Sequence, residues 1–251
     1  INAWVEQQTR ERIRDLIPAD ALDETTTLVL ANALYFKMPW AEEFSGGATR
    51  PGPFKNAGGS ESTVSMMNRT DRFGYAADGN WTLVTVPFRS GAFQFVFMLP
   101  GKEGTLPAVL PAAELLGKAA SLPRRQVALS APKFRLEPPT MPLGDILKKL
   151  GMPNAFDIPR GSADFDAMAP RRPDDYLYLS EVFHKTFLDL GEKGVEAAAA
   201  TAVVMMRATS IPMMEEPVSV VIDRPFAFAI QHTQTGAALF LGRVSSLPSN
   251  P

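Results

Sequence analysis

Apolar side chains change their spacing along this chain, and the changes predict helices and strands in an irregular order. Residues 1–17 carry charges between apolar side chains at helical spacing, so we predict an amphipathic helix that ends before Pro18 and buries Val5, Ile13, Leu16 and Ile17. Helices are also expected over 106–122 and 141–150, the second ending at Gly151. Strands are predicted over 25–36, 62–67, 81–87, 93–99, 127–136, 176–190, 218–222, 227–232 and 237–244. Because strands and helices do not alternate regularly, we expect an α+β fold.

The strand predicted over 25–36 is apolar or β-branched along most of its length, which is typical of a strand buried on both faces. Asn32 is the exception. A buried amide needs hydrogen-bond partners, so Asn32 predicts a hydrogen bond inside the sheet.

A run of small residues, 191–204, follows the strand predicted over 176–190 and reads G-E-K-G-V-E-A-A-A-A-T-A-V-V. Its alanines favour a short buried helix, whereas its β-branched residues favour a strand. With period two, one face is small or β-branched and uncharged, and it consists of Val195, Ala197, Ala199, Thr201 and Val203. The opposite face holds Glu196, Ala198, Ala200 and Ala202. A strand that slides between two existing strands needs such a face, and poly-alanine leaves the run able to exist outside a sheet too.

Composition narrows the classes of function. The 251 residues suit one large domain or two small ones, with 45% hydrophobic and 21% charged residues. The net charge of −2 gives no general attraction to nucleic acid, and the chain contains no cysteine. No apolar run reaches the roughly 20 residues that a membrane span needs.

The sequence contains no recognisable pattern of catalytic residues. The two histidines, His184 and His232, have no nucleophile elbow or acid partner at a recognisable spacing. No pattern of histidine or cysteine indicates a zinc site. We therefore assign no catalytic residue, no metal site and no cofactor.

Several motifs together resemble the serpin family of serine protease inhibitors. The run from Glu192 to Thr201 is similar to the proximal hinge of the loop that inhibitory serpins present to proteases. The segments I-N-A-W-V-E-Q-Q-T at 1–9, L-A-N-A-L-Y-F-K-M-P-W at 30–40, V-V-I-D-R-P-F at 220–226 and L-F-L-G-R-V at 239–244 agree in order with other landmarks of that family. Ala227 departs from the larger apolar residue that is usual there.

The resemblance implies three β-sheets with helices and an exposed reactive-centre loop over 191–217. It implies one serpin domain over 1–251 that starts at the family's helix F, so that the N-terminal part of the fold would precede Ile1. The hinge residues it implies are Glu192, Gly194, Val195, Glu196, Ala197, Ala198, Ala199, Ala200 and Thr201.

The activity implied is that of a suicide-substrate inhibitor of serine or cysteine proteases, in which the cleaved loop inserts into the large sheet and traps the acyl-enzyme. Counting from Glu192 places the scissile bond at Ala208–Thr209, with Arg207–Ala208 as the runner-up and Met206–Arg207 less favoured. The alternative is a non-inhibitory serpin with a carrier, storage or chaperone role. Small uncharged hinge residues favour inhibition, because non-inhibitory members tend to carry bulky, charged or proline residues there.

By position, His184 matches the family histidine that bonds the strand asparagine, here Asn32, and the pair would form a latch where the sheet opens. The resemblance also implies a monomer with an extracellular location, whose partner is a target serine protease held in a covalent acyl complex. No nucleic-acid or membrane partner is expected. The family's usual glycosaminoglycan site would lie before Ile1, so heparin dependence stays open.

Overall fold

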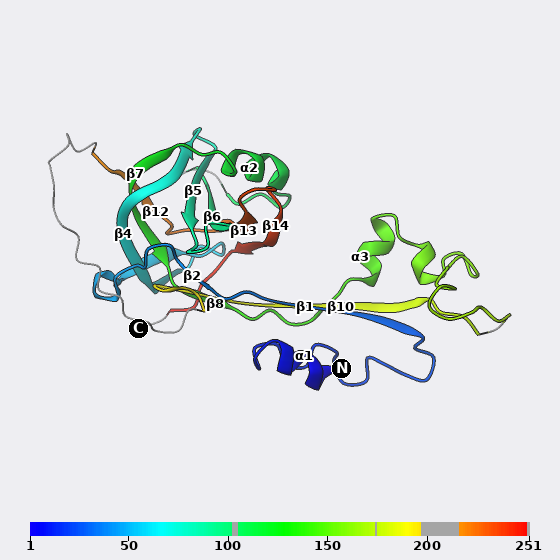
Figure 1. Ribbon diagram of the computed structural model, residues 1–251. Helices are drawn as coiled ribbons and strands as arrows, with labels where there is room; N and C mark the ends of the chain where they lie inside the picture. The colour runs from blue at the N-terminus through cyan, green and yellow to red at the C-terminus, as the bar shows by residue number, and fades with distance from the viewer. Residues whose placement is uncertain (102–104, 174, 197–215, 250–251) are drawn as a thin grey trace. The chain divides into compact units, whose positions relative to one another are not determined.

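The computed structural model describes residues 1–101, 105–173, 175–196 and 216–249 (Figure 1). The chain divides into two compact units. One comprises residues 1–36 and 135–188, and the other comprises residues 37–134 and 189–251. Strand β10 (Leu179–Gly191) begins in the first unit and ends in the second.

The first unit is organised around a parallel pair of strands. Strand β1 (Leu28–Tyr35) lies beside β10, with register partners from Leu28↔Leu179 to Tyr35↔Phe187 (Figure 1). Strand β9 (Met141–Pro142) is antiparallel to β10, and β8 (Phe134–Leu136) also pairs with β10. The helices of this unit are α1 (Asn2–Gln8), α3 (Gly144–Lys149) and the 3-10 helix η2 (Asn154–Phe156).

The helix predicted over 1–17 is much shorter in the structure, since α1 ends at Gln8. The Thr9 hydroxyl donates to the Val5 carbonyl at 2.8 Å and accepts from the Ile13 N–H at 3.1 Å, replacing helical bonds by side-chain bonds. Arg10 and Glu11 then take positive φ angles of 52° and 61°, which no helix can continue. The apolar positions were nonetheless identified correctly, because all four of them are buried: Val5, Ile13, Leu16 and Ile17.

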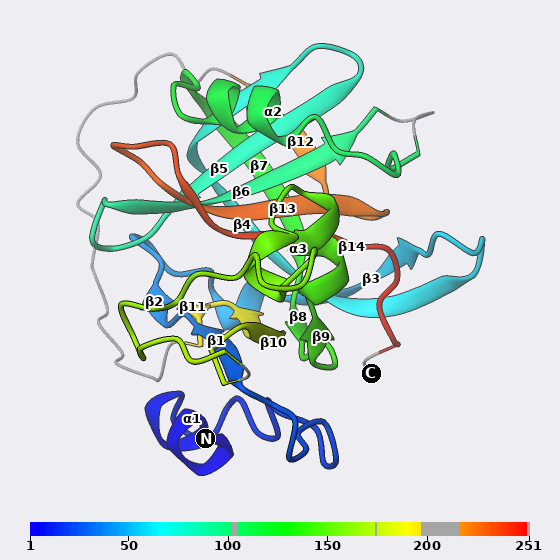
Figure 2. The ribbon, with the colours of Figure 1, turned by 90° about the vertical axis from the view of Figure 1, so that its right-hand side faces the viewer.

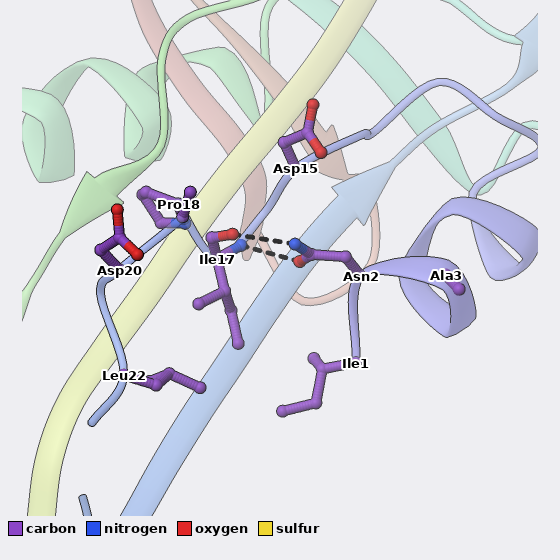
Figure 3. A pocket seen from close by; sticks show the side chains of 9 residues that line it. Ile1, Asn2, Ala3, Asp15, Ile17, Pro18, Asp20 and Leu22 are labelled. Carbon is purple, nitrogen blue, oxygen red and sulfur yellow. Dashed lines mark hydrogen bonds between the residues drawn. The ribbon is translucent and has the colours of Figure 1, made fainter. Parts of the chain in front are cut away.

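A side-chain amide closes this N-terminal segment on itself. The Asn2 side chain donates to the Ile17 carbonyl at 2.8 Å and accepts from the Ile17 N–H at 2.9 Å (Figure 3). The paired bonds imitate the way two strands bind each other. They hold the end of the irregular segment against the start of α1.

The prediction that residues 25–36 form a strand buried on both faces is wrong in part. The strand is present as β1, but Leu30, Ala31 and Asn32 in its middle are exposed, and Leu30 is 47% exposed. Among the described residues β1 pairs with β10 alone, so only one of its edges is occupied. A hollow of about 430 Å³ lies over these residues and is lined further by Trp4, Val5, Gln8, Thr9, Ala33 and Val182.

The second unit contains a long, mostly antiparallel sheet (Figure 2). In spatial order its strands are β12 (Val218–Val221), β7 (Arg124–Pro132), β4 (Glu61–Ala77), β5 (Trp81–Pro87), β6 (Phe93–Pro100), β13 (Phe226–His232) and β14 (Ala238–Val244), with β3 (Arg50–Lys55) pairing with β4. Only β12 and β7 are parallel to each other in this order. A short 3-10 helix, η1 (Gly46–Ala48), precedes β3.

Helix α2 (Ala112–Ala119) covers part of this sheet (Figure 2). Its buried residues Leu115 and Ala119 pack with Leu83, Val96 and Met98. The helix is shorter than the predicted 106–122 because Pro111 takes the N-cap position and a proline cannot sit deeper in the helix.

The strand predicted over 81–87 is present with the same bounds, and the one predicted over 62–67 is longer in the structure, as β4. The helix predicted over 141–150 begins only at Gly144, after Pro142, and Gly151 with φ of 103° ends it as expected. The strand predicted over 127–136 divides at Lys133 into β7 and β8.

We expect Thr9→Val to destabilise the fold by roughly 1–3 kcal/mol, because the isosteric side chain leaves the buried Ile13 N–H without its acceptor. Urea unfolding of the two proteins measures the difference. Thr63→Val on β4 is the matched control, since Thr63 is exposed, and its effect should stay within about 0.5 kcal/mol. Equal effects at the two positions would contradict the role given to Thr9.

Candidate functional site at the turn after the long strand

The chain reverses direction immediately after β10, at the start of the run of small residues. Strand β11 (Gly194–Val195) returns antiparallel to β10, with Leu190↔Val195 and Gly191↔Gly194 as register partners. Strand β2 (Met38–Pro39) pairs with β11 as well. Val195 is therefore fully buried, at 0% exposure, and the Glu196 N–H donates to the Asp189 carbonyl at 2.8 Å.

Gly194 is required at the close approach of β11 to β2. Its φ is +137°, in the region that side chains rarely adopt. A Cβ at this position would lie 2.2 Å from the Met38 carbonyl oxygen and 2.6 Å from the Pro39 Cα. Both neighbours are backbone atoms, and displacing them would distort strand β2. The glycine thus fixes where the run of small residues begins.

Two aromatic residues bind the turn. The Trp40 N–H donates to the Lys193 carbonyl at 3.0 Å, and the Trp40 indole N–H donates to the Gly191 carbonyl at 2.9 Å. The Phe44 N–H donates to the Glu192 carbonyl at 2.8 Å. Trp40 is fully buried and Phe44 nearly so, at 0% and 3% exposure. The carbonyls of three successive residues are satisfied by one short segment.

The Glu192 side chain adds an ionic contact. Its carboxylate accepts from Lys133 Nζ at 2.9 Å and from the Thr49 hydroxyl at 2.9 Å. Burial alone would raise the pKa of the Glu192 carboxyl, but the hydrogen bonds from Lys133, from its own N–H and from Thr49 hold that pKa below its ordinary value. The carboxylate is therefore ionised at neutral pH.

The structure brings four of the hinge residues predicted from sequence to this turn: Glu192, Gly194, Val195 and Glu196. The remaining ones, 197–201, and the candidate scissile bonds at 206–209 lie outside the described residues.

Asn32 and His184 face each other in the register of β1 and β10, as the latch requires. The Asn32 side chain is exposed, and the His184 Nδ1 atom is buried without a hydrogen-bond partner within the part of the chain that the structure describes. The hydrogen bond expected between the two is not formed in this structure. The latch stays a prediction.

Sequence reasoning missed the residues that hold the turn: Trp40, Phe44, Thr49 and Lys133. Trp40 could have been found, because a tryptophan that follows Pro39 shortly after a predicted strand indicates a large buried side chain. Lys133 gave no signal, because its place opposite Glu192 depends on where β7 stops.

The described residues contain no group of three or more histidine, cysteine, aspartate or glutamate side chains that could hold a metal ion. None of the helices among those residues combines the length and the apolar character that crossing a bilayer demands.

Comparisons with known proteins agree with this architecture. The model of the family "Serpin (serine protease inhibitor)" matches residues 1–247. The leukocyte elastase inhibitor of Equus caballus is 35% identical over 257 residues, which cover 98% of this chain and 65% of the relative. An uncharacterised serpin-like protein of Thermococcus kodakarensis is 35% identical over 248 residues, covering 97% of this chain and 55% of the relative.

Solved serpin structures share the fold. The thermophilic serpin tengpin in its native state has a TM-score of 0.83 at 28% identity, covering 98% of this chain and 62% of that structure. Human thyroxine-binding globulin has a TM-score of 0.79 at 29% identity, covering 99% and 63%.

The serpin-like α+β fold expected from sequence is confirmed by these structures. The chain spans less than two thirds of the length of the relatives named above, between 55% and 65%. The family match extends over nearly all of its own residues, from 1 to 247, and the chain belongs to the serpin family.

Proposed function

We propose that this serpin is a suicide-substrate inhibitor of serine proteases, with cysteine proteases as a second class of target. Cleavage in the loop after Glu196 leaves an acyl-enzyme, and the freed loop then enters the large sheet as a new strand between β1 and β10. The proposal is for a polypeptide of full serpin length, because the chain spans only 55–65% of the relatives named above.

One observation supports the proposal above others. The run 195–201, in which every residue except Glu196 is small and uncharged, continues from β11, which is already antiparallel to β10. Extending β11 in the same sense along β10 would produce the inserted strand without reversing the chain again. Side chains of this size could enter between β1 and β10 with little displacement of their neighbours.

The free energy available from insertion is large. About a dozen residues would gain ladder hydrogen bonds, at a net ~1 kcal/mol each, so the total is on the order of 10 kcal/mol. Burial of Val195 adds nothing to this total, because its side chain is already at 0% exposure before insertion.

The scissile bond we propose is Ala208–Thr209, and Arg207–Ala208 is the runner-up. An alanine before the cleaved bond suits elastase-like or subtilisin-like enzymes, whereas an arginine suits trypsin-like enzymes. The target protease, a monomeric state and an extracellular location are parts of the proposal that rest on the family resemblance.

The second candidate is a non-inhibitory serpin. Thyroxine-binding globulin, whose structure is similar to this one, is named for binding thyroxine. The hinge favours inhibition, since a carrier has no need for a run of uncharged alanines after Gly194.

We expect the protein to form an SDS-stable covalent complex when it is mixed with subtilisin, with elastase or with trypsin. Gel electrophoresis shows the complex, and sequencing of the released C-terminal peptide identifies the cleaved bond. Cleavage of the loop should also raise the Tm strongly, because the inserted strand adds to the sheet. Cleavage with no covalent band and no rise in Tm would favour the carrier alternative.

Thr201→Arg should convert the inhibitor into a substrate, because it places a charge on the uncharged face that enters the sheet. Ala200→Arg is the matched control on the opposite face and should impair trapping less. The measurement is the number of inhibitor molecules consumed per protease trapped. An unimpaired Thr201→Arg protein would refute insertion.

Glu192→Gln should destabilise the protein at pH 7 by about 1 kcal/mol, because Lys133 loses its ionised partner. The folded-state pKa of Glu192 is lowered, so its stabilising effect is complete above the ordinary value of 4.5 and is lost as the pH falls through the folded pKa. The difference in Tm between the two proteins should therefore close in acid. Glu137→Gln, at an exposed pair with Arg135, is the control and should change Tm little. A difference that persists unchanged at pH 3 would contradict the ionic role.

A further inference from the structure

The segment 40–44, which binds the turn at residues 191–193, is held separately at its two ends. At its start, Trp40 stacks on Phe88 with ring centroids 4.7 Å apart and planes 8° from parallel. The Ala41 N–H also donates to the Pro87 carbonyl at 3.0 Å. This end is fixed by β5 and the residue after it. The other end, which carries the Phe44 N–H, needs a support of its own.

Arg69 on β4 supplies that support. Its guanidinium lies over the ring of Phe44 at 5.6 Å and over the ring of Phe73 at 5.0 Å. It donates to the Glu42 carbonyl and forms an ion pair with Asp71. The side chain is only 13% exposed. A single, largely covered arginine side chain thus binds the backbone at residue 42 and the ring at residue 44.

The carboxylate of Asp71 balances the positive charge of Arg69. Burial would raise the pKa of the Asp71 carboxyl, but the hydrogen bond from Arg69, the N–H of Arg72 and the nearby positive charges lower it overall. The pair is therefore ionised at neutral pH, and the guanidinium is not left buried without a counter-charge. A planar cation also stacks on two rings in a way that an ammonium cannot.

We propose that Arg69 is a positioning residue for the hinge: it fixes residues 42–44 so that the Phe44 N–H meets the carbonyl of Glu192. Within the described part of the chain Arg69 forms no hydrogen bond or ion pair with residues 191–196, and it acts through Phe44. Its consequence for inhibition rests on the proposed function. A hinge whose base is not fixed starts insertion from a range of geometries, and more acyl-enzyme hydrolyses before it is trapped.

Hydrogen exchange tests the positioning role without any protease. In Arg69→Lys, which keeps the charge opposite Asp71 but loses the planar stacking on the rings, we expect the amide of Phe44 to exchange roughly three- to thirtyfold faster, the range that corresponds to a weakened cation–π contact. Peptides covering 189–196 should exchange faster too. Arg69→Met, similar in length and uncharged, should give a larger effect at the same amides.

Arg171 provides a matched control. It lies over the ring of Tyr176 at 4.3 Å, pairs with Asp166 and donates to the Ala163 carbonyl, so it makes the same kinds of contact in the other unit. Arg171→Lys should leave the exchange of Phe44 and of residues 189–196 unchanged. If Arg69→Lys and Arg69→Met also leave it unchanged, or raise exchange evenly over the whole chain, the positioning role is refuted.

A second experiment tests the effect on inhibition: it measures how many molecules of each variant are consumed for each protease molecule that is trapped. We expect Arg69→Lys to consume more than the wild-type protein and Arg171→Lys to consume the same number. Failure of the wild-type protein to form a covalent complex would refute the proposed function and leave the exchange result to decide the role of Arg69. A wild-type complex with no change in Arg69→Lys or Arg69→Met would refute the proposed effect of Arg69 on trapping.

Discussion

Three consecutive carbonyl groups, those of residues 191–193, accept hydrogen bonds from Trp40 and Phe44. Backbone carbonyls shielded from water need hydrogen-bond partners, and the binding of all three to one neighbouring segment holds the turn in place. The ion pair of Glu192 with Lys133 and the lack of space for a Cβ at Gly194 act on the same turn. The direction in which the chain leaves β10 follows from these contacts.

The same contacts fix the base of the loop, while the small residues that follow take no part in them. Its base is fixed by aromatic residues and a partly exposed ion pair, whereas the residues from Ala197 to Val204 are small and uncharged. Rigidity comes from partners outside the run, mainly the segment 40–44 and Lys133. The composition of the run is therefore free to serve the insertion that we propose.

Much of the fold was accessible from sequence because burial follows apolar spacing. Val5, Ile13, Leu16 and Ile17 were identified as buried residues although most of their helix does not exist. The error had a local cause, since the Thr9 hydroxyl competes for helical bonds and spacing does not register that competition. Pro111 and Pro142 shortened the two later helices, and both were visible in the sequence.

Some residues of the site could likewise be predicted from the sequence, and others could not. Gly194 and Val195 could be identified because the requirement for small residues is local. Lys133, Thr49 and Phe44 could not, because they come from positions far from the turn in sequence, and only the register of β7 and the path after β2 bring them to Glu192. A contact between two segments that are distant in sequence produces no recognisable pattern in the sequence of either segment.

The close fit of Gly194 and Val195 against β2 also has a consequence for the length of the loop. Because these two residues set the register, each later side chain of the inserted strand that we propose would point inward or outward according to whether its distance from Val195 is even or odd. Removing one residue from the run would exchange the two sets, and removing two would restore them. Natural or engineered variation in this stretch should therefore favour steps of two residues over steps of one.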